Sequence, residues 1–151
     1  MTSLLLEGGV LATILTIAAW FDVRAMRIPN FVNLALVVTG VVAAWINTDI
    51  VAALIGVASG YVLLFGANAL YRVARGRDGV GMGDAKLLAG GGAWIGWMGL
   101  PFVVLIGSAL GLAYVAALRL AGRELQRTDK LPFGPFLCIA IMVVWIALEY
   151  R

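Results

Sequence analysis

The apolar run "LLAGGGAWIGWMGLPFVVLIGSALGLAYVAAL", from Leu87 to Leu118, decides how the chain is arranged in a membrane. Basic residues flank it on both sides: Arg72, Arg75, Arg77 and Lys86 before it, and Arg119, Arg123, Arg127 and Lys130 after it. Because Lys and Arg concentrate in cytoplasmic loops, both flanks belong in one compartment. The run must therefore cross the membrane twice. We expect helices at 86–100 and 102–118, with a hairpin at Gly99–Leu100–Pro101 between them.

The composition of the whole chain is that of a membrane protein. Hydrophobic residues make up 63% of the 151 residues and charged residues 13%, whereas a soluble domain is about 45–50% apolar and about 25% charged. A membrane-spanning helix needs about 20 mostly apolar residues. Four further apolar segments approach that length, at 4–21, 31–46, 50–70 and 133–148. We therefore predict an all-α integral membrane protein with six transmembrane helices, forming a single multi-pass domain over 1–151.

The positive charges also orient these six helices. All Lys and Arg residues except Arg151 fall in the connections after the first, third and fifth helices. Those connections are predicted to face the cytoplasm, which puts both termini outside. The N-terminal segment carries Glu7 instead of a basic region, so we expect a retained helix and not a cleaved signal peptide. Glycine pairs such as Gly56 and Gly60 favour packing within the bundle over dimerisation, and the oligomeric state stays open.

Several kinds of site and partner are excluded by composition. The chain has no histidine and one cysteine, Cys138, so a zinc site of the usual kinds is not expected. We expect no metal and no other cofactor. The isoelectric point near 9.4 suggests nucleic acid at first sight. The arginines, however, are dispersed between apolar segments, which indicates membrane lipids as the partner and no nucleic acid.

Two carboxylates lie at the predicted cytoplasmic boundary of the membrane. Asp22 follows "LTIAAWF" at the end of the first helix, and Asp84 precedes "AKLLAGGGAWIGW" at the start of the fourth. Ionisable groups at membrane helices are costly and are candidates for function. Taken singly, each has a structural explanation. Asp84 can be the N-cap of its helix, and Asp22 can be an interfacial charge balanced by Arg24 or Arg27.

Taken together, the two carboxylates suggest a reaction, because both lie at one depth and can converge inside the bundle. Like charges at close range do not both ionise easily, so one of the two keeps its proton. The ionised carboxylate can then take a proton from water while the protonated one polarises a carbonyl. Such a pair titrates as a unit. This is the chemistry of aspartic proteases, and it requires neither histidine nor metal.

Three motifs resemble one known family. The segment "GMGDAKLL" (Gly81–Leu88) contains the G-x-G-D signature of membrane-embedded aspartic proteases, and "DVRAMRIPN" (Asp22–Asn30) looks like the first-aspartate motif of type IV prepilin peptidases. The segment "LPFGPFL" (Leu131–Leu137) is similar to the motif of their last helix. The resemblance covers residues 15 to 145, and the three motifs occur in the family's order.

The resemblance implies a membrane endopeptidase that removes the basic leader from prepilins or pseudopilins at the cytoplasmic face of the inner membrane, in type IV pilus or protein-secretion systems. It assigns Asp22 and Asp84 as the catalytic pair. Gly81 and Gly83 would let the loop approach the substrate backbone, since glycine has no Cβ. The motifs also contain further residues that would shape the substrate site: Ile28, Pro29, Asn30, Lys86, Pro132, Phe133, Gly134 and Pro135. Lys86 and the loop arginines are expected to meet anionic lipid headgroups or acidic parts of the substrate.

The chain departs from the larger members of that family in one respect. Those members carry a cytoplasmic domain with two C-x-x-C pairs near the N-terminus, and they also methylate the new N-terminus. This sequence has no cysteine pair, so we expect peptidase activity without N-methyltransferase activity. The compact form resembles the short peptidases of tight-adherence (Flp/Tad) pilus systems, and archaeal preflagellin peptidases are a related alternative.

Two functions from other classes remain as alternatives. A small proton- or ion-coupled transporter would use Asp22 and Asp84 as relay carboxylates, but such relays are expected near the middle of the membrane. A non-catalytic membrane subunit of a pilus or secretion apparatus would depend on helix surfaces and on neither aspartate. Substitution of each aspartate separates these alternatives from the peptidase.

Overall fold

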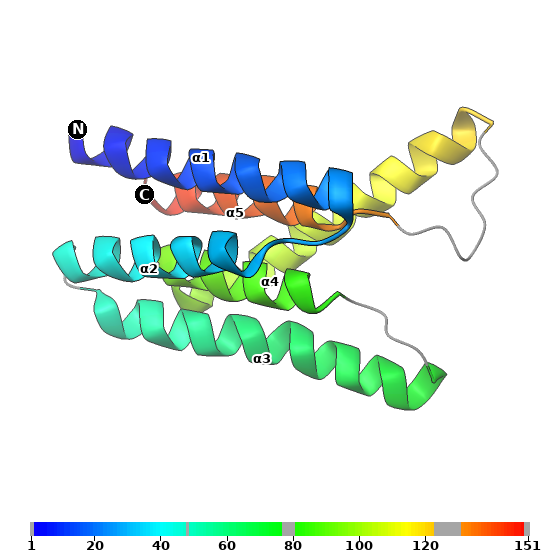
Figure 1. Cartoon of the computed structure of the whole chain (residues 1–151), viewed down its shortest axis with the longest axis horizontal. Coiled ribbons are helices and arrows are strands. Elements are labelled where there is room, and N and C mark those ends of the chain that lie inside the picture. The colour runs from blue at the N-terminus through cyan, green and yellow to red at the C-terminus, as the bar shows by residue number, and fades with distance from the viewer. Residues whose placement is uncertain (1, 48, 77–80, 123–130, 150–151) are drawn as a thin grey trace.

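The computed structural model describes residues 2–47, 49–76, 81–122 and 131–149, and these residues form five helices. They are α1 (Thr2–Ala25), α2 (Asn30–Ile46), α3 (Ile50–Arg75), α4 (Met82–Leu120) and α5 (Gly134–Glu149). Figure 1 shows α1, α2 and α3 side by side, with α4 and α5 packed behind them. The expectation of an all-helical protein is therefore confirmed for this part of the chain. The basic connections at 77–80 and 123–130, and Arg151, lie outside the described residues.

The position predicted for the turn within the run at 86–118 is wrong. The run belongs to one element, α4, which has a single residue with non-helical dihedral angles, Gly96 (φ 66°, ψ 179°). Pro101, predicted to lie in the turn, is inside the helical part of the second half. A positive φ is strained for residues with a Cβ but not for glycine, so the chain breaks at Gly96 and not at Gly99–Leu100–Pro101.

The break at Gly96 reverses the direction of α4. In the first half, Gly91 lies against Ile141 of α5. In the second half, Gly107 lies against Leu137, and Gly111 lies against Phe133, just before α5 begins. The first half thus runs parallel to α5 and the second half runs antiparallel to it. Figure 1 shows the second half, in yellow, returning to the end at which α4 starts and extending beyond it.

Glycines allow α3 and α4 to pack closely. A Cβ on Gly60 would lie 2.7 Å from the carbonyl oxygen of Leu88, and Gly56 and Gly92 face one another with still less room. Small residues of this kind let helix backbones approach in membrane bundles. Gly56 and Gly60 therefore pack within the chain.

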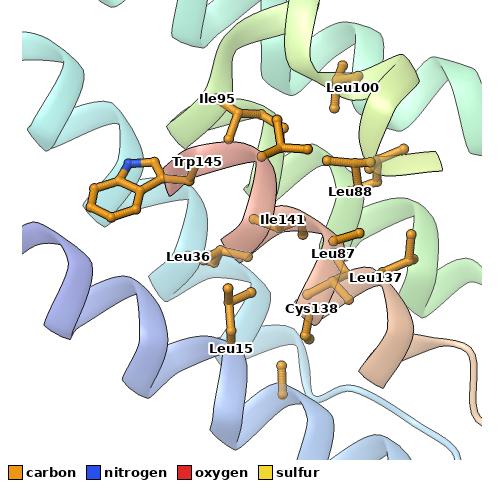
Figure 2. Close-up of a cluster of buried hydrophobic side chains, with 14 of the residues drawn as sticks. Leu15, Leu36, Leu87, Leu88, Ile95, Leu100, Leu137, Cys138, Ile141 and Trp145 are labelled. Atoms are coloured by element: carbon orange, nitrogen blue, oxygen red, sulfur yellow. The ribbon is translucent and has the colours of Figure 1, made fainter. Parts of the chain in front are cut away.

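The core lies where α1, α2, α4 and α5 meet. Figure 2 shows Leu15 of α1, Leu36 of α2 and the α4 pair Leu87 and Leu88 converging on Ile141 of α5. All of these side chains are 3% exposed or less. This packing fixes the relative positions of the helix ends that carry the polar motifs.

Three of the helices have the length and apolar composition needed to cross a membrane: Leu4–Ala25, Ile50–Arg75 and Met82–Leu120. Helices α2 and α5 are equally apolar but shorter, with 17 and 16 residues. Large hydrophobic side chains are exposed along the outer faces of the bundle, Leu54 and Leu105 among them. Such a surface suits lipid and would be unusual for a protein in water. The prediction of a membrane protein is confirmed by the length and composition of these helices.

Candidate active site

Asp22 lies in the last turn of α1, which continues four residues past the predicted end at 21. Its side chain is buried, with 7% of its surface exposed. The backbone N–H of Gly134 donates a hydrogen bond to Asp22 Oδ2 at 2.9 Å. A Cβ on Gly134 would lie 2.7 Å from that same oxygen. The first residue of α5 is therefore fitted against the Asp22 carboxylate in a way that only glycine permits.

The end of α1 aims the following motif at the site. Met26 adopts a left-handed conformation (φ 51°), and its N–H donates to the carbonyl oxygen of Asp22 at 2.9 Å. This is the αL arrangement that ends many helices, although glycine is the usual residue there. The turn directs the chain from Asp22 through Ile28 to the start of α2.

Asp84 lies in the first turn of α4 and is half-buried. The prediction that Asp84 caps this helix is wrong, because the N-cap residue is Gly81. The Asp84 carboxylate is instead hydrogen-bonded to the Gly81 backbone and lies close enough to Asp22 for the two charges to repel. Placing an acidic side chain in the first turn also suits the helix dipole.

The two carboxylates share one pocket of about 320 Å³. Gly83 packs against Ile28, since a Cβ on Gly83 would lie 3.7 Å from the Ile28 nitrogen. The pocket therefore brings together the first-aspartate motif and the G-x-G-D motif. Its described lining residues are Asp22, Met26, Arg27, Ile28, Asn30, Gly81, Met82, Gly83, Asp84 and Lys86.

One hydrogen bond joins these two motifs across the pocket. The ammonium group of Lys86 donates to Asn30 Oδ1 at 2.7 Å. The sequence predicts that Lys86 contacts lipid or substrate, whereas the structure gives it a partner within the chain. The bond connects the start of α2 to the first turn of α4. It therefore connects α2 to the helix that carries Asp84.

Four other predicted site residues do not line the pocket. Pro29 is the N-cap residue of α2, where its missing N–H costs no helical hydrogen bond. Phe133 packs against Gly111 in the second half of α4. Neither residue, nor Pro132 or Pro135, is among the described residues that line the pocket. Of the motif near α5, Gly134 is the residue with a direct contact to Asp22.

The interfacial explanation for Asp22 does not fit its surroundings. Arg24 lies over the ring of Trp20, with its guanidinium carbon 4.9 Å from the ring centroid. Arg27 lines the pocket at an exposed position. An interfacial carboxylate balanced in this way would be exposed to water, whereas Asp22 is buried and takes its hydrogen bond from Gly134.

Sequence reasoning missed two buried residues of the bundle. Cys138 is buried on α5, and its thiol lies within electrostatic range of both carboxylates. Cys138 follows Gly134 by four residues, so both lie on one face of α5. This spacing is the sequence signal that could have identified Cys138. Asn33 is a buried polar residue on α2, three residues after Asn30 in an otherwise apolar run.

Comparison with known proteins agrees with this geometry. Residues 9–116 match the type IV leader peptidase family. The chain belongs to this family. The matched residues include both carboxylates, the G-x-G-D motif and the break in α4, so the elements that form the pocket are elements of the family. No solved structure matches the chain.

Three relatives show what share of a family member's length this chain matches. It is 34% identical over 145 residues to a prepilin leader peptidase/N-methyltransferase of Aeromonas salmonicida, covering 95% of this chain and 48% of the relative. The corresponding protein of Pseudomonas aeruginosa is 36% identical over 96% of this chain and 48% of the relative. That of Burkholderia pseudomallei is 38% identical over 85% and 42%. The chain thus spans about half the length of these relatives.

Proposed function

We propose that this chain is a membrane-embedded aspartic endopeptidase that removes the leader peptide from type IV prepilins or pseudopilins. The observation that carries the proposal is the shared pocket of Asp22 and Asp84. The two residues are far apart in sequence, yet they come together at the ends of α1 and α4. Membership of the leader peptidase family supports the substrate class.

The mechanism follows from the close approach of two carboxyl groups. At close range the pair shares one proton, and it titrates as a unit. The ionised carboxylate takes a proton from a water molecule, whose oxygen attacks the carbonyl carbon of the scissile bond. The protonated carboxyl polarises the carbonyl oxygen and stabilises the negative charge that develops there. Collapse of the tetrahedral intermediate breaks the C–N bond, and the leaving amine takes up the proton that the carboxylate removed from water.

The surrounding residues have roles that follow from their contacts. The Gly134 N–H fixes the orientation of the Asp22 carboxylate. Gly81, which is exposed beside Asp84, leaves room for the backbone of an extended substrate segment. Asn30 and Lys86 hold the two sides of the pocket at a fixed separation through their hydrogen bond.

The same proposal includes the arrangement in the membrane. With α4 crossing twice because of its reversal at Gly96, the chain crosses six times, and both termini lie outside. The pocket then opens at the cytoplasmic face of the inner membrane, where the basic connections would meet anionic lipid headgroups. The substrate leader is basic and is made in the cytoplasm, so it reaches the pocket from that side. We assign only the peptidase reaction to this chain.

The proposal is tested by cleavage of a prepilin with a basic leader, co-expressed with the chain and followed by gel mobility. Asp22→Asn and Asp84→Asn remove the ionisable carboxyl group and keep the side-chain shape. Each substitution should therefore reduce cleavage by about 10³-fold or more. Asp49→Asn is the matched control, because Asp49 is exposed just before α3 at the other end of the bundle. If either aspartate-to-asparagine variant of the pair still cleaves at the wild-type rate, the carboxylate mechanism is wrong. A transporter or an assembly subunit would show no cleavage in any variant.

A further inference from the structure

A second cavity adjoins the Asp22–Asp84 pocket. It has a volume of about 340 Å³ and lies between the last turns of α3 and the start of α4. Gly81 and Met82 line both cavities, and a Cβ on Gly81 would lie 3.4 Å from Asp84 Oδ2. This second cavity, called the α3 cavity below, therefore begins directly beside Asp84. Its described lining residues are Phe65, Asn68, Ala69, Arg72, Val73, Gly81 and Met82.

The packing of α3 against α4 explains the position of the α3 cavity. Gly60 lies against Leu88, and the glycine pair one turn away keeps the same register with the two helices antiparallel. One further turn along α3 brings Leu64 level with Asp84. Helix α3 then continues past the start of α4, as Figure 1 shows. The residues after Leu64 therefore pass the carboxylate pocket and form a wall beside it.

The lining of the α3 cavity suits apolar side chains. Its α3 residues recur at spacings of three and four, so they lie on one face of the helix. Phe65, Val73 and Met82 are apolar and exposed. Arg72 is the one charged residue among the described lining residues, whereas the neighbouring pocket contains the two carboxylates. The α3 cavity is therefore less favourable to a basic side chain than the carboxylate pocket is.

The length of this wall sets how much of a substrate it can contact. From Phe65 to Val73 the helix advances about 12 Å, at about 1.5 Å per residue. An extended chain advances about 3.3 Å per residue. A segment that runs along the wall therefore contacts it with about four residues on one side of the scissile bond.

We propose that the α3 cavity is a substrate subsite, in which apolar side chains that follow the scissile bond contact Phe65, Ala69 and Val73. The inference rests on the proposed peptidase function. The substrate backbone passes over Gly81, which has no side chain to obstruct it, and so connects the carboxylates to the cavity. The basic leader lies on the other side of the scissile bond, because the Arg72 guanidinium repels it from the α3 cavity.

The decisive variant is Ala69→Trp, studied in the whole chain, because an indole at this position fills the cavity. The substrates are a prepilin with apolar residues at the first four positions after the scissile bond, and four versions with alanine at one of these positions. For the intact prepilin, the variant should lower kcat/KM by about 10- to 100-fold, since a large apolar side chain loses its burial. For at least one alanine version, the variant and the wild type should differ by less than about twofold, because no large side chain remains to be displaced.

The matched control is Ala67→Trp, which adds the same side chain at an exposed position of α3 outside the cavity lining. It should leave kcat/KM unchanged for every prepilin. Equal losses for all five prepilins in Ala69→Trp would overturn the inference, and so would coupling to leader positions instead of the positions after the bond. A similar loss in Ala67→Trp would also overturn it, because the effect would then belong to the lipid-facing surface in general.

Arg72→Glu gives a second test that does not depend on filling the cavity. With lysine at the position coupled to Ala69, the wild-type chain should cleave the prepilin poorly. Arg72→Glu should raise kcat/KM for this lysine version, relative to the apolar prepilin, by about two- to fivefold, since Arg72 is exposed and solvent screens its charge. An unchanged ratio would overturn the inference.

Failure of the subsite can be distinguished from failure of the proposed function. If Asp22→Asn and Asp84→Asn abolish cleavage while the losses from Ala69→Trp and the alanine prepilins are additive, the peptidase stands and the subsite is wrong. If the two aspartate variants cleave at the wild-type rate, the proposed function itself is wrong.

Discussion

The two ends of the helical bundle both contain acidic residues beside a cavity, but they differ in how the acids are held. At one end, Asp22 is buried and hydrogen-bonded to Gly134, and Asp84 faces it across a pocket of about 320 Å³. At the other end, a larger cavity of about 490 Å³ is lined by Glu7, Asp49 and Glu149. Those three carboxylates are exposed or partly exposed.

The candidate site is therefore distinguished by how its carboxylates are held, and not by the size of its cavity. In the proposed mechanism, Asp22 and Asp84 share a proton because they occupy one partly buried pocket. Among the described residues, no buried backbone N–H at the far end donates to a carboxylate as Gly134 does to Asp22. Glu7 instead accepts a hydrogen bond from the exposed amide of Asn47, at 3.4 Å. A change at one end can therefore be compared with a matched change at the other.

Among substitutions of residues around the two carboxylates, the largest effect is expected from Gly134→Ala. The added Cβ would lie 2.7 Å from Asp22 Oδ2, so the carboxylate must move and loses its bond to the Gly134 N–H. Removing one fixed hydrogen-bond donor from a catalytic site typically costs about 10²–10³ in kcat, and cleavage of a prepilin should fall by about that factor. Gly9→Ala is the control, because a Cβ on Gly9 meets nothing within 4 Å. Equal cleavage by the two alanine variants would contradict the assigned role of Gly134.

A smaller effect is expected from Lys86→Met. Methionine has nearly the length of lysine but removes the charge and the bond to Asn30 Oδ1. Lys86 is partly exposed, so solvent screening limits the bond to about 1 kcal/mol, which corresponds to about a fivefold loss of kcat/KM. Asn30→Ala should produce a similar loss, and the double variant should be little worse than either. Additive losses in this double-mutant cycle would mean that the two residues act independently.

Part of this arrangement could be predicted from the sequence. Asp22 and Asp84 could be singled out because each lies where an apolar run meets a basic segment, and depth along helices is set by sequence length alone. The direction of α4 on either side of its turn could also be inferred, because charge on both flanks requires a reversal. These features depend on composition and spacing, which the sequence displays directly.

Other features depend on conformation and could not be predicted in this way. Gly99 and Pro101 have the composition of a turn, but the residue with a positive φ is Gly96, and several glycines nearby are equally permissive in sequence. Asp84 is a good N-cap residue, yet the N-cap residue is Gly81 and the helix begins at Met82, so the carboxylate is in the first turn. The bond from Gly134 to Asp22 joins residues 112 positions apart. Only the packing of α5 against α1 brings them together.

The smallest effect is expected from Glu7→Gln at the far end. The substitution removes one carboxylate from the larger cavity but keeps an acceptor for Asn47, whose bond to Glu7 is long and exposed. Exposed polar pairs contribute little, so unfolding free energy should change by less than about 0.5 kcal/mol, and cleavage should stay at the wild-type rate. The matched change at the other end is Asp22→Asn, which also replaces a carboxylate by an amide of the same shape, but at a buried position. Cleavage by Glu7→Gln at about a tenth of the wild-type rate or less would mean that the two ends are coupled through α1, because that helix carries both Glu7 and Asp22. Unaltered cleavage, measured with thermal unfolding in the same detergent, would confine the chemistry to the Asp22–Asp84 end.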